Sequence, residues 1–418
     1  MQTQLAPEFK ATPDGDAAEA ILRKCVHCGF CTATCPTYQL LGDELDGPRG
    51  RIYLIKQVLE GQRPTRATQL HLDRCLTCRN CESTCPSGVH YGNLVDIGRR
   101  VVDAQVERPL LERLTRSALK EGLTSPLFAP AMKLGQALRP LLPAALKIKV
   151  PARSSARAHQ WPTRAHLRKV LLLMGCVQPS MMPNINAATA RVLDAAGIQT
   201  LVADDAGCCG AIRTHLNDHE GGLNDMRRNI DAWWPLVDGL TSAGTVEAIV
   251  MNASGCGVTV KEYAHHLAHD PVYAEKAVRI SALTKDLSEL LPELLPLLKP
   301  KLRSGAGTLA FHPPCTLQHG QQLRGGVESG LRELGFEVDV ATNESHLCCG
   351  SAGTYSVLQP ELAYQLRDRK LANLEPLQAQ TIVSANIGCI QHLQTGTATP
   401  VRHWIEVVDD ALAAVASR

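Results

Sequence analysis

The sequence predicts a multidomain protein in which an α-helical N-terminal domain is followed by two α/β repeats with parallel sheets. Two observations predict this order. Apolar residues recur at helical intervals in the first 120 residues, as in Arg51–Glu60, and the same stretch carries one cysteine motif twice. After residue 167, short β-rich apolar runs alternate with helical segments, and the whole series occurs twice. Such alternation is typical of parallel α/β units.

Composition divides the chain further. We expect the helical domain over residues 1–120, a linker with short helices over 121–166, the first repeat over 167–300 and the second over 301–418. Pro151–His166 has the composition of a linker. Ser125–Val150 is apolar but interrupted by prolines and basic residues. Two interpretations of it stay open: packing on the chain's own domains, or amphipathic helices at a partner or membrane surface.

Composition also excludes several classes of function. A net charge of +2 and an aromatic content of 4% argue against a nucleic-acid partner. The first 24 residues lack an apolar core and a cleavage signature, and no run approaches the roughly 18–20 apolar residues that span a bilayer. In a chain without an export signal, 16 clustered cysteines indicate metal or redox chemistry rather than disulfides. We therefore expect a cytoplasmic metalloprotein.

The N-terminal cysteines follow the pattern C-x2-C-x2-C-x3-C-P, once from Cys25 to Pro36 and once from Cys75 to Pro86. In two-cluster ferredoxins, the first three cysteines of such a motif hold one [4Fe–4S] cluster and the fourth ligates the other. The predicted ligands are Cys25, Cys28, Cys31 and Cys85 for the first cluster, and Cys75, Cys78, Cys81 and Cys35 for the second. Zinc explains the pattern less well, because it requires neither the third cysteine nor the repeated Cys-Pro. The 39 residues between the motifs favour an α-helical ferredoxin domain.

Each α/β repeat carries four further cysteines in matched order. They are Cys176, Cys208, Cys209 and Cys256 in the first repeat, and Cys315, Cys348, Cys349 and Cys389 in the second. The intervening residues number 31 and 46 in the first repeat, and 32 and 39 in the second. Each of these cysteines or cysteine pairs falls where a predicted strand ends. Parallel sheets place ligands at the edge formed by these strand ends. Adjacent cysteines are too close for an unstrained disulfide, so a cluster or metal is the better explanation than buried structural thiols.

Four segments resemble the iron–sulfur subunits of bacterial glycolate oxidases: CVHCGFCTATCPTYQLLGDELDGPRGRIYLIKQVLEG, CLTCRNCESTCPSG, HLCCGSAGTY and ANIGC. The resemblance covers nearly the whole chain and implies two cysteine-rich (CCG) domains after the ferredoxin domain. It implies an electron-transfer subunit of a glycolate dehydrogenase, an oxidoreductase acting on a CH–OH group, with D-lactate as a second candidate substrate. The implied partners are a flavoprotein carrying FAD and a quinone or other acceptor. The implied location is peripheral, on the cytoplasmic face of the inner membrane.

The residues agree that this chain transfers electrons and that a partner oxidises the substrate. Clusters cannot accept the hydride that leaves a 2-hydroxy acid, and the chain has no G-x-G-x-x-G after a strand, so we expect the substrate site on a partner chain. The architecture also resembles the third subunit of anaerobic glycerol-3-phosphate dehydrogenase. Heterodisulfide reductases resemble the repeats too, but their closing C-x-x-C is replaced here by Thr259 and His392. Thiol–disulfide chemistry, zinc and a further cluster therefore stay open for the repeats.

Small residues after Cys349 favour the second repeat as the point of electron exit. Gly350, Ser351 and Gly353 allow close backbone approach to a bound group, whereas the first repeat has bulkier residues there. His312 and His346 lie near the cysteines of the second repeat in sequence. They are candidates to tune an acceptor or to play a structural part only.

Overall fold

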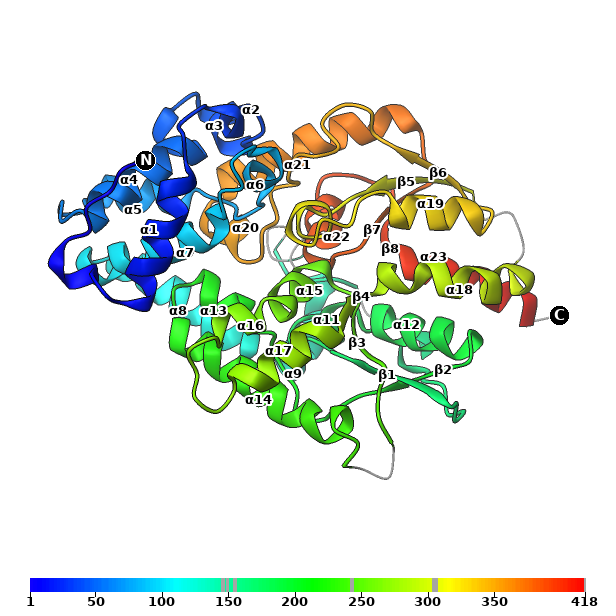
Figure 1. Ribbon diagram of the computed structural model, residues 1–418. Helices are drawn as coiled ribbons and strands as arrows, with labels where there is room; N and C mark the ends of the chain where they lie inside the picture. The colour runs from blue at the N-terminus through cyan, green and yellow to red at the C-terminus, as the bar shows by residue number, and fades with distance from the viewer. Residues whose placement is uncertain (144–146, 148–149, 153–155, 241–243, 303–306, 417–418) are drawn as a thin grey trace.

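Figure 1 shows a computed structural model that describes residues 1–143, 147, 150–152, 156–240, 244–302 and 307–416. A helical N-terminal domain (blue) lies beside a first α/β repeat (green) and a second one (yellow to red). Each repeat contains a four-stranded parallel sheet. The predicted fold class is therefore confirmed.

The N-terminal domain is built from short helices around one apolar core. Its helices are α1 (Pro13–Lys24), α2 (Phe30–Ala33), α3 (Pro36–Leu41), α4 (Pro48–Leu59), α5 (Arg66–Asp73), α6 (Asn80–Thr84) and α7 (Tyr91–Gln105). Leu22, Ile55 and Leu94 are fully buried in that core, where α4 packs on α7. Gly98 permits this contact, because a Cβ there would lie 2.5 Å from Ile55. The core thus holds together α1, which precedes the first cysteine motif, α4, which lies between the motifs, and α7, which follows the second.

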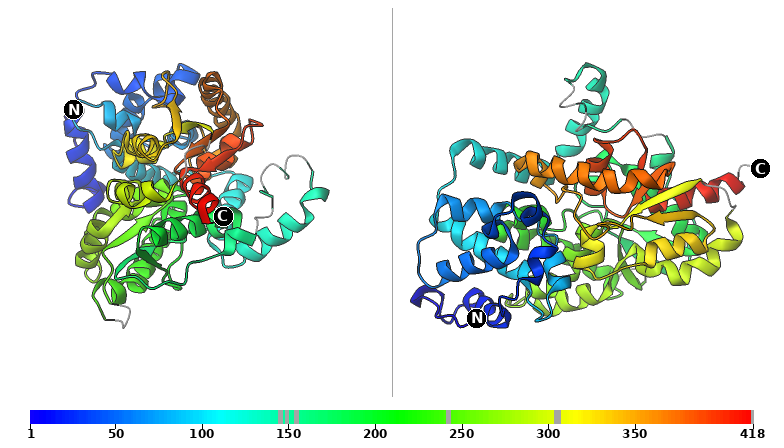
Figure 2. Two further views of the ribbon diagram at one scale, coloured as in Figure 1. Left: turned by 90° about the vertical axis from the view of Figure 1, so that its right-hand side faces the viewer. Right: turned by 90° about the horizontal axis from the view of Figure 1, so that it is seen from above.

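Two helices lead from this domain to the first repeat, α8 (Leu110–Thr124) and α9 (Phe128–Leu138). We call α9 and the following 3-10 turn (Arg139–Leu141) the arm; it stands out from the body of the molecule in both views of Figure 2 (teal). Leu134 and Leu141 on the arm are 61% and 81% exposed. The predicted segment Ser125–Val150 also includes 144–146 and 148–149, which lie outside the described residues. Over the described ranges, no helix combines the length and apolar character needed to cross a bilayer.

The first repeat has the strand order β2-β1-β3-β4, all parallel. Its strands are β1 (Arg168–Leu172), β2 (Ile198–Leu201), β3 (Ala248–Met251) and β4 (Thr284–Asp286). Its helices are α11 (Gln178–Met181), α12 (Pro183–Ala195), α13 (Ala211–His215), α14 (His219–Val237), α15 (Ser254–Lys261), α16 (Tyr263–His266), α17 (Ala274–Leu283) and α18 (Leu291–Leu298). Helices α12 and α18 share a core with one face of the sheet, and α14 and α17 share a core with the other.

The second repeat has the equivalent strand order, β6-β5-β7-β8. Its strands are β5 (Thr308–His312), β6 (Glu337–Val340), β7 (Thr381–Ser384) and β8 (Val401–His403). Its helices are the π-helical turn η7 (Thr316–Gly320), α19 (Gly326–Glu333), α20 (Tyr355–Leu358), α21 (Pro360–Leu374), α22 (Ile387–Gln394) and α23 (Trp404–Ala416). Leu172 pairs with Val250 in the first sheet as Phe311 pairs with Val383 in the second.

The two repeats pack on each other reciprocally. Helix α12 of the first contacts α23 of the second, and α18 of the first contacts α19 of the second. The buried residues of these helices form one continuous core with both sheets. At its edge, His403 hydrogen bonds through Nε2 to the carbonyl of Asn252 at 2.8 Å. The repeats are therefore one packed unit, as Figure 1 shows where α12, α18 and α23 lie between the sheets.

Candidate metal centres

The first cysteine motif forms a tight loop between α1 and α2. Cys25 caps the C-terminus of α1, and the chain then turns through Gly29, whose φ is +85°. A φ in this left-handed region favours glycine. The side chains of Cys25, Cys28 and Cys31 line a cavity of about 30 Å³ together with Cys85 of the other motif.

The second motif repeats this arrangement before and within α6. Cys75, Cys78 and Cys81 line a cavity of about 20 Å³ together with Cys35 of the first motif. Cys81 borders both cavities and so lies between them. Each cavity thus combines three cysteines of one motif with the fourth cysteine of the other.

The thiols at both cavities are chemically suited to a cationic group. Burial, and then the neighbouring Cys25 thiolate, raise the pKa of Cys31 to about 11. Burial raises the pKa of Cys81 well above its ordinary value, and the neighbouring Cys78 adds to this. Four thiolates so close together repel one another unless positive charge lies between them. The donor set therefore fits iron–sulfur clusters.

Two buried arginines place fixed positive charge beside the second cavity. Arg51 is 1% exposed and donates to Thr37 Oγ1 at 3.1 and 3.2 Å, and that hydroxyl lies 3.3 Å from Cys35 Sγ. Its charge is balanced by Asp46 at 3.4 Å. Arg99 on α7 donates to the Cys75 carbonyl at 2.6 Å. Charge of this sign stabilises an anionic cluster.

The four cysteines of the first repeat meet at the carboxyl edge of its sheet. Cys208 hydrogen bonds with Cys176 and Cys209, and Cys209 with Cys256. These contacts hold the pKa of Cys208 well below its ordinary value. Burial and then the Cys208 thiolate raise the pKa of nearby Asp225 to about 6.

The second repeat brings its four cysteines together in the same way. Cys348 hydrogen bonds with Cys315 and Cys349, and Cys349 with Cys389. The charged side chain beside these thiols is a lysine. Lys370 on α21 is 2% exposed, and the attraction of Cys315 and of the paired Cys348 and Cys349 opposes the lowering of its pKa by burial.

The first repeat's thiols open on a cavity of about 480 Å³ between the domains. Cys176, Cys208, Cys209 and Cys256 all border it. Its walls also include apolar side chains of α8 and α9, part of the second motif, and the segment 351–358 of the second repeat. The thiols of the second repeat are not among its lining residues. A thiol-bound group in the first repeat thus faces this space, whereas the thiols of the second repeat do not border it.

The second motif instead packs directly on the second repeat. Cys78 and Leu76 share an apolar cluster with Cys315 and Cys348. Tyr355 Oη donates to the carbonyl of Arg74 at 3.1 Å. This contact brings the second N-terminal cavity next to the thiols of the second repeat.

The side chain of His319 completes the same contact. His319 lies between Ser83 Oγ, 3.0 Å from its Nδ1, and the carbonyl of His346, 2.8 Å from its Nε2. The His346 carbonyl also accepts from Asn80 at 3.3 Å. His346 thus contributes its backbone here, while His312 lies at the end of β5 beside Cys349 and Cys389.

Sequence reasoning missed several of these residues. Tyr91, whose Oη lies 3.6 Å from Cys75 Sγ, and Arg99 both belong to α7, whose sequence shows only a helical period. Lys370 lies in the middle of α21, far along the chain from the cysteines it faces.

Fold and thiols together define an iron–sulfur protein with a two-cluster helical domain and a duplicated cysteine-rich unit. A family model described as a 4Fe-4S dicluster domain matches residues 21–89. A second model, described as a cysteine-rich domain (CCG), matches residues 170–261 and 309–394. The first model covers both N-terminal motifs, and the second covers the four cysteines of each repeat but ends before β4 and before β8.

Two relatives match this chain over nearly its full length, and a third matches part of it. The chain is 56% identical to the glycolate oxidase iron–sulfur subunit of Escherichia coli, over 99% of both chains. It is 29% identical to the probable glycolate oxidase iron–sulfur subunit of Bacillus subtilis, over 94% of this chain and 92% of the relative. Lactate utilization protein A of Geobacillus thermodenitrificans is 26% identical over 58% of this chain and 98% of its own. The chain belongs to the family of glycolate oxidase iron–sulfur subunits, which confirms the resemblance seen in the sequence.

Proposed function

We propose that this chain carries electrons within a flavin-dependent glycolate dehydrogenase complex that also accepts D-lactate. A flavoprotein partner holding FAD would oxidise the substrate, and this chain would pass the electrons to a membrane quinone or another acceptor. The relatives named for glycolate oxidase and lactate utilization support the substrate class. The observation that carries the proposal is the contact between the second N-terminal cavity and the thiols of the second repeat.

The N-terminal thiols would hold two [4Fe–4S] clusters, which supply one-electron chemistry when bound. The proposed ligand sets are Cys25, Cys28, Cys31 and Cys85, and Cys75, Cys78, Cys81 and Cys35. The grouping of the same thiols around two cavities supports these sets. Pulsed and continuous-wave electron paramagnetic resonance (EPR) of Cys85→Ser tests the exchange of fourth ligands. Loss of the signal held by Cys75, Cys78 and Cys81 instead would overturn it.

Each cysteine-rich repeat would hold a further metal group, a cluster or zinc, at its group of four cysteines. The mutual contacts of the thiols in each repeat support this. The position of the second repeat against Cys78 favours it as the receiver of electrons from the N-terminal domain. The cavity beside Cys176 and Cys256 favours the first repeat as the exit, which is the reverse of the order expected from the glycines after Cys349.

The arm would attach the complex peripherally to the cytoplasmic face of the inner membrane. Its exposed leucines and the exposed Lys133 support an interfacial role. Leu134→Asp with Leu141→Asp should release the complex from membrane vesicles at low salt, while Val278→Asp on α17, an equally exposed apolar site, should not. If all these variants remain bound, a partner chain carries the attachment.

The domain division 1–120, 121–166, 167–300 and 301–418 belongs to the same proposal. The decisive experiment is anaerobic purification of the chain alone and with its flavoprotein partner, with iron, zinc, acid-labile sulfide and flavin counted in each. We expect at least two clusters and no flavin on the isolated chain, and dye-linked glycolate oxidation only with the partner. Stoichiometric flavin and turnover on the isolated chain would refute the proposed role.

A further inference from the structure

His312 differs from the other buried histidines of the described residues in its hydrogen bonding. It is the last residue of β5, its side chain is 1% exposed, and neither ring nitrogen has a hydrogen-bond partner. By contrast, His403 bonds through both nitrogens, to the Asn252 carbonyl at 2.8 Å and the Ile405 N–H at 3.2 Å. Buried polar groups in proteins are nearly always paired. An unpaired buried imidazole therefore needs an explanation.

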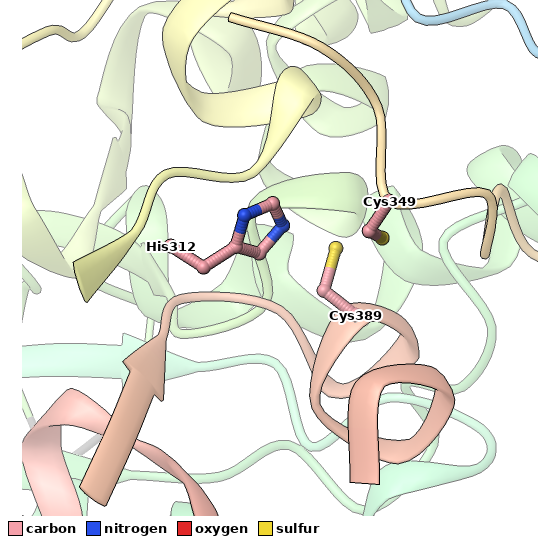
Figure 3. A group of neighbouring side chains, drawn as sticks. All are labelled: His312, Cys349 and Cys389. Atoms are coloured by element: carbon pink, nitrogen blue, oxygen red, sulfur yellow. The ribbon is translucent and has the colours of Figure 1, made fainter. Parts of the chain in front are cut away.

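The ring points at two cysteines of the second repeat. Figure 3 shows it directed from the end of β5 toward the sulfurs of Cys349 and Cys389. One ring nitrogen of His312 and the two Sγ atoms all lie within 4.8 Å of one another, and all three residues are buried. A neutral imidazole nitrogen beside two thiolates is a donor set that suits zinc and iron.

The first repeat has no counterpart to this nitrogen. Leu173 stands three residues before Cys176, as His312 stands three residues before Cys315. Leu173 directly follows β1 and His312 ends β5, the equivalent strand of the second sheet, and Leu173 is 3% exposed. The repeats are thus matched in backbone and thiols but not at this position. Because leucine fills this position in the first repeat, the fold itself does not require a histidine there. The histidine of the second repeat is therefore explained by its own surroundings.

We propose that His312 is a nitrogen ligand, together with Cys349 and Cys389, of the metal group in the second repeat, whereas the first repeat uses thiolates alone. This deepens the proposed function, on which it rests for the presence of a metal group in that repeat. The metal is iron of a cluster or a zinc ion, since both accept mixed nitrogen and sulfur ligation.

The test uses the full-length chain, purified anaerobically and labelled with 15N only in histidine. Iron and zinc are counted, and X-ray absorption at both edges is fitted for imidazole scattering. Pulsed EPR compares 14N- and 15N-histidine samples wherever the group is paramagnetic. We expect a histidine nitrogen on one metal group, lost in His312→Leu, which copies Leu173, and in His312→Cys, which substitutes a thiol donor.

His346→Leu is the matched control, because that ring lies in the same repeat outside the proposed ligand set; it should keep the nitrogen signal. The EPR signals of the N-terminal clusters report whether each variant is folded. Metal in the second repeat with no histidine nitrogen, or a nitrogen signal that survives His312→Cys, would overturn this inference alone. Absence of any metal beyond the two N-terminal clusters would overturn both it and the proposed function of the repeats.

Discussion

The two cysteine-rich repeats have the same strand order and the same chain of contacting thiols, but they have different neighbours. The first repeat faces a cavity of about 480 Å³ and has Asp225 beside Cys208. The second is covered by the N-terminal domain and has Lys370 beside its thiols. A duplicated unit has thus become two sites with different charged neighbours, a carboxylate paired with Arg213 and Arg228 in the first repeat and a lysine in the second, and with different access. What each site can do follows from its surroundings more than from its own fold.

The largest expected effect comes from interrupting each repeat in turn. Cys256→Ser and Cys389→Ser should both reduce acceptor turnover of the assembled complex to background, because each removes one of four thiols. They should differ in where electrons stop. In Cys256→Ser, substrate should still reduce the N-terminal clusters and any redox-active group of the second repeat; freeze-quenched EPR measures this.

Cys389→Ser provides the opposite case. Electrons should then stop at the N-terminal clusters, leaving the first repeat oxidised after substrate is added. Reduction of a first-repeat group in Cys389→Ser at the wild-type rate would show that the two repeats act in parallel rather than in series.

A smaller effect is expected from filling the cavity next to the first repeat. Leu123 and Met132 line it, so Leu123→Trp or Met132→Trp should raise the KM for the acceptor by roughly tenfold, equivalent to about 1.4 kcal/mol of binding. Reduction of the N-terminal clusters by substrate should not change. Leu114→Trp on the exposed face of α8, where the leucine is 56% exposed, serves as control. If all three substitutions change the KM for the acceptor equally, the cavity is not the acceptor site.

The next prediction compares the buried polar side chains behind the thiols, a lysine in the second repeat and an asparagine in the first. Lys370 donates to the carbonyls of Glu344 and Ser345, and Asn229 in the first repeat donates to the Cys208 carbonyl at 2.7 Å. Lys370→Met and Asn229→Leu should each destabilise the fold by about 1–3 kcal/mol, because buried carbonyls lose their donors. Thermal unfolding measures this loss.

Only the lysine substitution should also change the redox behaviour. Removing its positive charge disfavours the more negative, reduced state, so the midpoint potential of a second-repeat cluster should fall in Lys370→Met. Asn229→Leu should leave the potential of the first repeat nearly unchanged. If a redox titration finds equal shifts of midpoint potential in both variants, the charge of Lys370 does not distinguish the two repeats.

The smallest effect concerns the contact of the first repeat with the N-terminal domain. This contact includes an ion pair, whereas the contact of the second repeat, described above, uses apolar side chains and hydrogen bonds. Glu262 pairs with Arg79. Burial raises the pKa of Glu262 above its ordinary value of 4.5, although Arg79 opposes this. Its ionised form is therefore less favoured in the folded state, so the contribution of the carboxyl to stability is greatest below about pH 4.5 and falls as the pH rises.

Glu262→Gln should thus gain stability relative to the parent between acidic and neutral pH, by about 1 kcal/mol or less. Chemical unfolding at pH 5 and pH 8 measures the difference. A relative loss at pH 8 would mean that the Arg79 pair outweighs burial.

The fold class was predictable because its signals are local. The Cys-Pro motifs and the apolar runs of β1, β3, β5 and β7 are visible in the sequence. The short strands β4 (Thr284–Asp286) and β8 (Val401–His403) were missed, since three residues with a charged or polar member carry no strand period. These two edge strands form only because tertiary packing places them beside the sheets.

The candidate site was predictable only in part, for the same physical reason. Strand ends in a parallel sheet converge, so the meeting of the thiols in each repeat could be expected from topology. The approach of Lys370 and Arg99 could not, because it depends on where whole helices pack. Nor could the sequence indicate which repeat faces the cavity. The glycines after Cys349 favoured the second, whereas domain packing places Cys176 and Cys256 there.

The contact of Cys78 with Cys315 and Cys348 also bears on how the protein is made. During translation, at about 5–20 residues per second, the second motif leaves the ribosome some tens of seconds before the chain that covers it. Until then its thiols remain open to the proteins that deliver iron and sulfide. Once the second repeat folds, that side is closed. Delivery of the second cluster is therefore easiest on the nascent chain, and in the folded chain the approach to Cys75 and Cys78 that remains is through the cavity between the domains.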